Sequence, residues 1–239
     1  MKKMVLTLVT LSMVVFGFAQ GGILGKVKSA VSSAKGGSPL STDEIVKGLK
    51  EALSVGTNNS TGKLSAADGF FKDLAVKVLM PPEAQKVEKT LRSVGAGKLV
   101  DDAILSMNRA AEDASKSAAP IFIDAIKNMS VNDALGILKG TDTAATAYLR
   151  KTTIAQLTAA FKPIIEASLQ KTGATKYWAA VFDKYNKMPL VTKVNTDLPG
   201  YATERALYGI FFYVAQEEAK IRNNPAARVS DILKKVFAK

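Results

Sequence analysis

The sequence predicts an all-α fold: a single compact multi-helix domain of about eight to ten short helices, after a flexible N-terminal leader. Apolar residues recur three and four positions apart through most of the chain after residue 40, which is the spacing of one helix face. Capping patterns such as Ser41–Glu44 precede several of these stripes, and glycine or proline follows them. Apolar residues make up 47% of the chain, enough to form the core of such a domain.

Residues 1–19 have the pattern of a secretory signal peptide. Two lysines follow the first methionine, an apolar run too short for a stop-transfer helix comes next, and a small-x-small pattern precedes Gln20. We expect cleavage after Ala19 and a periplasmic or secreted location for the mature chain.

Residues 20–39 form a basic leader rich in glycine and serine. Its apolar residues are spaced as on one face of a short helix, with lysines outside that face and a glycine pair near each end. Two interpretations stay open: the helix makes peripheral contact with an anionic membrane surface, or it packs on its own domain or is partly disordered. We expect the helical domain to span residues 40–239.

The first helix of that domain is expected to begin at the capping box Ser41–Glu44 and to end at Gly56. A polar surface loop is predicted over residues 58–63. Residues 70–79 are expected to form a helix or an extended connector, which the prolines 81–82 terminate before the next helix.

A strong helical pattern starts at Lys98 and continues to a break or kink at Pro120, after which a further helix follows. Its apolar stripe faces away from a polar face that carries Asp102, Ser106 and Arg109. Ser130 is expected to cap the next helix, which ends at Gly140.

Thr141 or Asp142 should cap another short helix through Leu149, followed by a longer one over residues 154–169 that carries Pro163. A helix around Trp178 and a loop over 187–200 come next. The uncharged segment 206–215 is too short for a bilayer and is predicted to be the central buried helix. Ser230 or Asp231 should begin the last helix.

The chain contains neither histidine nor cysteine, which excludes imidazole and thiolate metal sites and Ser-His-Asp or Cys-His catalysis. The adjacent carboxylates at 101–102, 112–113 and 217–218 project about 100° apart on a helix, so they do not converge on a substrate. No loop has the spacing of an EF-hand. We therefore expect that the protein is not an enzyme and binds neither a metal nor a cofactor. A histidine-free carboxylate-based hydrolase is the alternative.

The formal net charge of +12 favours anionic partners. Because the signal pattern directs the chain away from nucleic acid, we expect anionic lipid, glycan or an envelope protein instead. Solvated helix faces explain the same charges without a ligand. The candidate anion-binding residues are Lys220, Arg222, Arg228, Lys234, Lys235 and Lys239.

A polar cluster on one helical turn, the Arg109 cluster below, consists of Asn108, Arg109, Glu112 and Asp113. An arginine fork of this kind binds a carboxylate or phosphate ligand, or it joins a structural ion-pair network that ties the helix to a neighbour.

Aromatic residues gather on two predicted helices. They line a pocket for a lipid or another apolar ligand, or they belong to an ordinary aromatic core. The pocket candidates are Tyr177, Trp178, Phe182, Phe211 and Phe212.

Several short motifs stand in a fixed order along the chain: residues 108–112, 119–122, 144–148, 221–228 and 233–237. Together they resemble the bacterial domain of unknown function family 4197, from about Leu40 to the C-terminus. The resemblance implies an exported, mostly helical bacterial protein and brings no catalytic residue or cofactor. We expect a non-enzymatic interaction or binding protein of the bacterial envelope, with a carrier for a hydrophobic or anionic envelope ligand as an alternative.

Overall fold

The structure, a computed structural model, describes residues 40–190, 192–228 and 230–237. The expected signal peptide and the basic leader lie outside these ranges. Leu40 to Lys239 belong to one compact unit, and its described regular structure is entirely helical. The predicted all-α class is confirmed.

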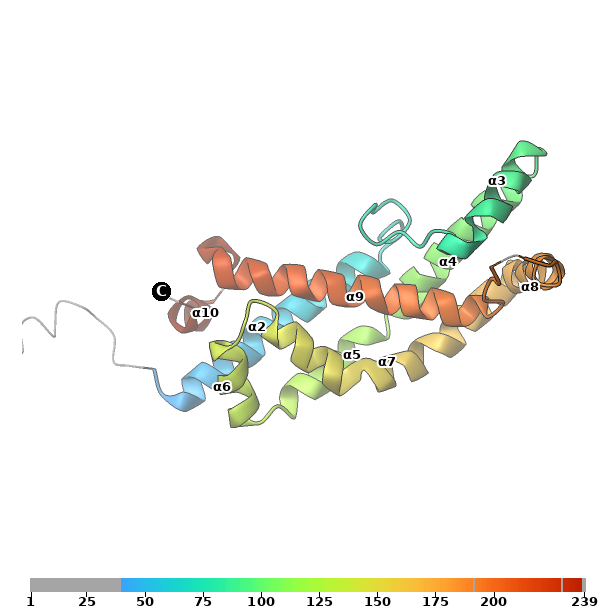
Figure 1. The fold of residues 1–239 in the computed structure, drawn as a ribbon. Helices are drawn as coiled ribbons and strands as arrows, with labels where there is room; N and C mark the ends of the chain where they lie inside the picture. Colours follow the sequence, from blue (N-terminus) through green and yellow to red (C-terminus); the bar gives the residue numbers. More distant parts are fainter. Residues whose placement is uncertain (1–39, 191, 229, 238–239) are drawn as a thin grey trace, which may run out of the picture. The chain divides into compact units, whose positions relative to one another are not determined.

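Four long helices form the centre of the fold: α2 (Thr42–Ser65), α4 (Gly97–Ser115), α7 (Ala144–Lys171) and α9 (Leu198–Asn223) (Figure 1). The prediction that the helices are short is wrong for these, since α7 alone has 28 residues and α9 has 26. The shorter elements are η1 (Pro82–Ala84), α3 (Gln85–Ser93), α5 (Ala118–Lys127), α6 (Val131–Lys139), α8 (Ala174–Tyr185), η2 (Pro225–Ala227) and α10 (Asp231–Val236).

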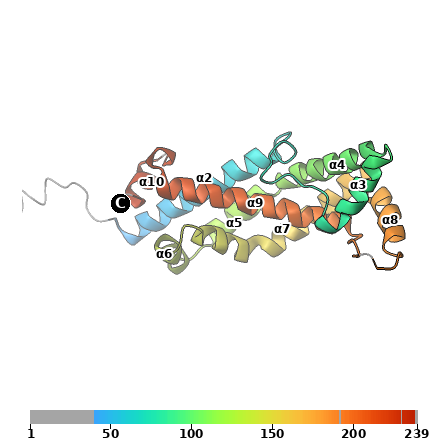
Figure 2. The ribbon, with the colours of Figure 1, turned by 45° about the horizontal axis from the view of Figure 1, so that its top comes forward.

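Helix α9 is the central element, because it packs against α2, α4 and α7 (Figures 1 and 2). Its uncharged segment 206–215 is largely buried, and the ring of Phe211 meets that of Phe122 edge-on at 5.8 Å between centroids. The predicted buried helix is confirmed, and it extends beyond that segment at both ends. Among the described residues, no helix combines the length and the apolarity needed to cross a bilayer.

Helix α2 continues through the predicted stop at Gly56 and through the predicted loop at 58–63, so both predictions are wrong. The hydroxyls of Thr57, Ser60 and Thr61 donate to the carbonyls four residues earlier and are buried. A Cβ atom at Gly56 would lie 3.3 Å from the Cβ of Glu217 on α9. The small and polar residues therefore let the two helices approach closely, while their polar atoms stay hydrogen-bonded within α2.

Helix α7 is continuous over the two helices predicted in its place. Its N-cap residue is Thr143, not Thr141 or Asp142, and it provides no side-chain cap. The second and third N–H groups of α7, those of Ala145 and Thr146, are bound instead by Glu218 of α9, a contact that local sequence does not reveal. The helix ends before Gly173, whose φ of 71° is left-handed and favours glycine.

Other boundaries agree with the sequence patterns. Ser41 and Ser130 form complete capping boxes, Ser230 caps α10, and α6 ends at Gly140. Of the two alternatives at 70–79, the helix is wrong. Residues 66–81, called the connector below, form turns over 67–72 and 74–76 and have no regular secondary structure over 77–81, so the connector is extended at most in its second half.

Replacing Gly209 with alanine should destabilise the fold. The new Cβ atom would lie 2.5 Å from Cε1 of Phe70 and 3.3 Å from Cβ of Val76, and both of these side chains are buried. Overpacking of this kind costs about 1–3 kcal/mol in the free energy of unfolding.

The matched control is Gly62→Ala in α2, where a new Cβ atom has no neighbour within 4 Å. This variant should be more stable by up to about 1 kcal/mol, because alanine is the better helix former. Urea unfolding of both variants checks the pair. Equal stability of the two variants would contradict the packing of α9 against the connector.

Candidate functional site

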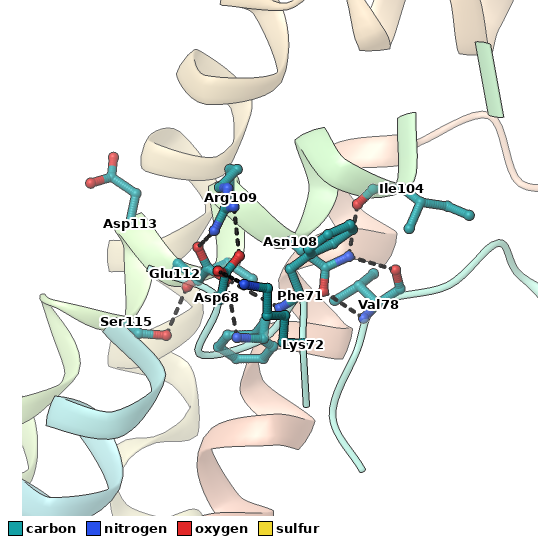
Figure 3. Close-up of polar contacts among 12 residues, drawn as sticks. Asp68, Phe71, Lys72, Val78, Ile104, Asn108, Arg109, Glu112, Asp113 and Ser115 are labelled. Carbon is teal, nitrogen blue, oxygen red and sulfur yellow. Dashed lines mark hydrogen bonds and ion pairs between the residues drawn. The ribbon is translucent and has the colours of Figure 1, made fainter. Parts of the chain in front are cut away.

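The side chain of Asn108 fastens the connector to α4 (Figure 3). Its amide oxygen accepts the N–H of Val78 at 2.8 Å, and its amide nitrogen donates to the carbonyls of Val78 at 2.8 Å and Ile104 at 2.7 Å. Asn108 is fully buried, and these three bonds pair both ends of its amide. It takes the role that a neighbouring strand would play for Val78.

Glu112 holds the start of the same connector. Its Oε1 accepts the backbone N–H groups of Phe70 and Phe71, both at 3.1 Å. Its Oε2 accepts Nη1 of Arg109 at 2.7 Å, and Nη2 of Arg109 donates to Asp68 at 2.7 Å (Figure 3). The hydrogen bond to Glu112, followed by that to Asp68, raises the pKa of Arg109.

The guanidinium of Arg109 is therefore occupied by two carboxylates of the chain itself. Lys72 and then Arg109 lower the pKa of Asp68. Asp113 pairs with Lys116 and points away from the other three members of the Arg109 cluster (Figure 3). The geometry matches the structural alternative for this cluster: it ties the connector to α4.

Glu218 on α9 is a second buried carboxylate that binds backbone N–H groups of another segment and an arginine of its own helix. It accepts the N–H groups of Ala145 and Thr146 at 3.0 and 2.8 Å, and it pairs with Arg222 at 2.9 Å. Arg222 also donates to the carbonyl of Ile137 on α6. The buried carboxylate of Glu218 thus links α9 to α7, and its partner Arg222 links α9 to α6.

Four of the basic residues near the C-terminus are bound by groups of the chain itself. Arg222 is bound as described, and buried Arg228 donates to the carbonyls of Ile221 and Arg222 at the end of α9. Lys220 pairs with Glu217 and Lys234 with Asp231, while Lys235 is exposed. Lys239 lies outside the described residues.

A further polar group joins α2, the connector and α9. Nζ of Lys63 lies 2.9 Å from the carboxylate of Asp73 and 2.6 Å from the hydroxyl of Tyr213, which donates to Asp73. Burial opposes ionisation of both groups, but the bonds to Tyr213 and to each other outweigh it, so the pKa of Asp73 is lowered and that of Lys63 is raised. Both groups are stabilised in their charged forms, which suits an ion pair and not a proton-transfer pair.

The aromatic candidates separate into two places. Tyr177, Trp178 and Phe182 belong to α8 and line a pocket between α8 and α4. Phe211 is buried in the core, and Phe212 stacks with Tyr208 at 6.3 Å between ring centroids. The structure thus brings three of the five predicted residues together.

This α4–α8 pocket has a volume of about 150 Å³. Its lining includes residues of α3, α4 and α8. These three helices lie at the same end of the fold (Figures 1 and 2). Its principal walls are Leu99, Ala103 and Ser106 of α4 and Ala174, Trp178 and Phe182 of α8.

The pocket exists because small side chains on α4 face large rings on α8. Ala103 and Ser106 leave space where a leucine would fill it. The ring of Trp178 is held in place, since its Nε1 donates to the carbonyl of Asn195 at 3.0 Å. The amide of Asn186 binds both the N–H and the carbonyl of Val194 at 2.8 Å, which closes the loop after α8.

Sequence patterns did not identify the α4 wall of the pocket. Ser106 and Asp102 were assigned to a polar face, although Leu99 and Ala103 precede Ser106 by seven and three positions and share its side of the helix. Within the described ranges, no group of three or more Asp or Glu side chains is arranged to hold a metal ion.

The family described as "Protein of unknown function (DUF4197)" matches residues 39–238, so the chain belongs to that family. No curated protein and no solved structure matches the chain.

Replacing Asn108 with alanine should destabilise the fold by about 2–4 kcal/mol, because it leaves the buried N–H and carbonyl of Val78 without partners. Asn132, which is exposed on α6, is the control, and Asn132→Ala should change stability by less than about 0.5 kcal/mol. Thermal and urea unfolding measure both. A loss for Asn108→Ala no larger than that of the control would refute the role of this amide.

Proposed function

For this member of the family, we propose a non-enzymatic binding protein of the bacterial envelope that holds a small apolar molecule in the α4–α8 pocket. The observation that carries the proposal is the apolar space of about 150 Å³ between Ala103 of α4 and Trp178 of α8. Protein cores are normally packed with few voids larger than a water molecule, so a space of this size is a candidate ligand site.

The volume sets the size of the ligand. An apolar cavity of about 150 Å³ accommodates one benzene-sized guest. The apolar part of the ligand is therefore one aromatic ring or a short acyl segment. Leu99 and Tyr177 at the rim are 55% and 64% exposed, so the pocket opens to solvent and a larger molecule can extend outward from it.

The lining supports binding in preference to hydrolysis. Asp102, the one carboxylate among the described lining residues, is paired with Lys98 at 2.7 Å. The hydroxyl of Thr172 donates to the carbonyl of Leu169. No second carboxylate or lysine in the described lining stands beside Ser106 to activate it as a nucleophile.

An apolar ligand is favoured over an anionic one for a related reason. Arg222 and Arg228, the most buried of the candidate anion-binding residues, are bound by groups of the chain itself. The envelope location rests on the signal-peptide pattern of residues 1–19.

Toluene is a suitable probe, because it fits one ring into the pocket. Trp178 is the single tryptophan of the chain, so its fluorescence reports directly on the pocket. We expect saturable quenching or a spectral shift with a dissociation constant on the order of 1 mM or lower. Ala103→Met should weaken toluene binding at least about tenfold, since the longer side chain fills the space.

The control is Ala159→Met, an exposed position on α7 away from the pocket, which should bind toluene as the parent does. Circular dichroism checks that both variants remain folded. Absence of saturable toluene binding by the parent, or equal binding by Ala103→Met, would refute the proposed function.

A further inference from the structure

Ser106 is the unusual polar residue of the α4–α8 pocket. It is only 9% exposed and lies on the α4 wall among apolar side chains. Its hydroxyl has no hydrogen-bond partner among the residues that the structure describes. Three buried hydroxyls of the long helices α2, α4 and α7 behave differently: those of Ser60, Ser115 and Thr153 donate to the carbonyl four residues earlier at 2.7, 2.7 and 2.6 Å.

Ser106 lines the pocket and is 9% exposed, so its hydroxyl, which makes no internal bond, is available to a ligand. The same helix shows the contrast, since Ser115 of α4 satisfies itself within the helix. Ser106 can both donate and accept, so a ligand hydroxyl or carbonyl oxygen is a suitable partner.

The charges of the lining restrict the ligand further. None of the described lining side chains is lysine or arginine, and the carboxylate of Asp102 stands at the pocket. A carboxylate or phosphate group placed near Ser106 would lack a counter-charge and would face Asp102. A neutral hydroxyl or carbonyl oxygen needs no counter-charge and is not repelled by Asp102.

We propose that the α4–α8 pocket is specific for small neutral aromatic or short-chain molecules that carry one hydroxyl or carbonyl oxygen, and that Ser106 binds this oxygen. The inference rests on the proposed function, because it assigns the ligand class of the same pocket. Trp178 and Phe182 contact the apolar body of the ligand, and Ser106 sets its orientation.

Phenol and toluene test the inference, because they are similar in size and phenol carries a hydroxyl group where toluene carries a methyl group. Affinities are measured on the full chain by Trp178 fluorescence and by calorimetry. Ser106→Ala should weaken phenol binding about tenfold and leave toluene binding within about twofold, since only phenol loses a hydrogen bond. Ser106→Cys, which keeps nearly the same volume but is a weaker donor, should lie between the parent and Ser106→Ala for phenol.

Thr175→Val is the matched control. The Thr175 hydroxyl is fully enclosed and has no partner in the described part of the chain, and the residue does not line the pocket. This variant should keep the parent's ratio of phenol to toluene affinity.

The outcomes separate the two proposals. If neither probe binds the parent, the proposed function fails and the inference fails with it. If toluene binds and Ser106→Ala weakens phenol no more than it weakens toluene, the inference is overturned while the pocket stands. If Thr175→Val changes the affinity ratio as much as Ser106→Ala does, the assignment to Ser106 is overturned.

Discussion

Two buried carboxylates hold together segments that are far apart in the sequence. Glu112 binds successive N–H groups of the connector, and Glu218 binds successive N–H groups at the start of α7. Each also pairs with an arginine on its own helix, Arg109 in one case and Arg222 in the other. Removing either carboxylate would leave two N–H groups without a partner and a guanidinium with one partner fewer, so the positions of α7 and the connector depend on these residues.

These hydrogen bonds between side chains and backbone explain how a chain without cysteine keeps irregular segments in place. The amides of Asn108 and Asn186 act in the same way, since each binds both backbone groups of one valine in a segment without regular secondary structure. The connector and the loop after α8 are thus held by side chains and not by a sheet. The pocket lies next to both, with Met80 at the end of the connector and Trp178 bonded to the loop.

Local sequence predicted those features that depend on neighbours along the chain. The capping boxes at Ser41 and Ser130 and the buried segment of α9 follow from residues within one or two turns. The continuation of α2 past Gly56 did not follow, because it depends on the close approach of α9. The beginning of α7 was misplaced for the same reason: its cap, Glu218, comes from more than seventy residues later.

The candidate site was predictable to a similar degree. Tyr177, Trp178 and Phe182 share one helix, so their grouping is a local property, whereas Phe211 and Phe212 lie on a helix whose orientation only the fold determines. The role of Ser106 was hidden because a serine beside Asp102 on a helix resembles an ordinary solvated face. Only the packing of α8 against α4 converts that face into a pocket wall.

The proposed function requires that the space between α4 and α8 stays open as an apolar pocket in solution. A crystal structure of the chain under xenon pressure tests it most directly, since xenon occupies apolar cavities of this size. We expect an ordered xenon atom between Ala103 and Trp178, with the surrounding side chains unchanged. A pocket closed by inward movement of α8, with no xenon bound there, would contradict it.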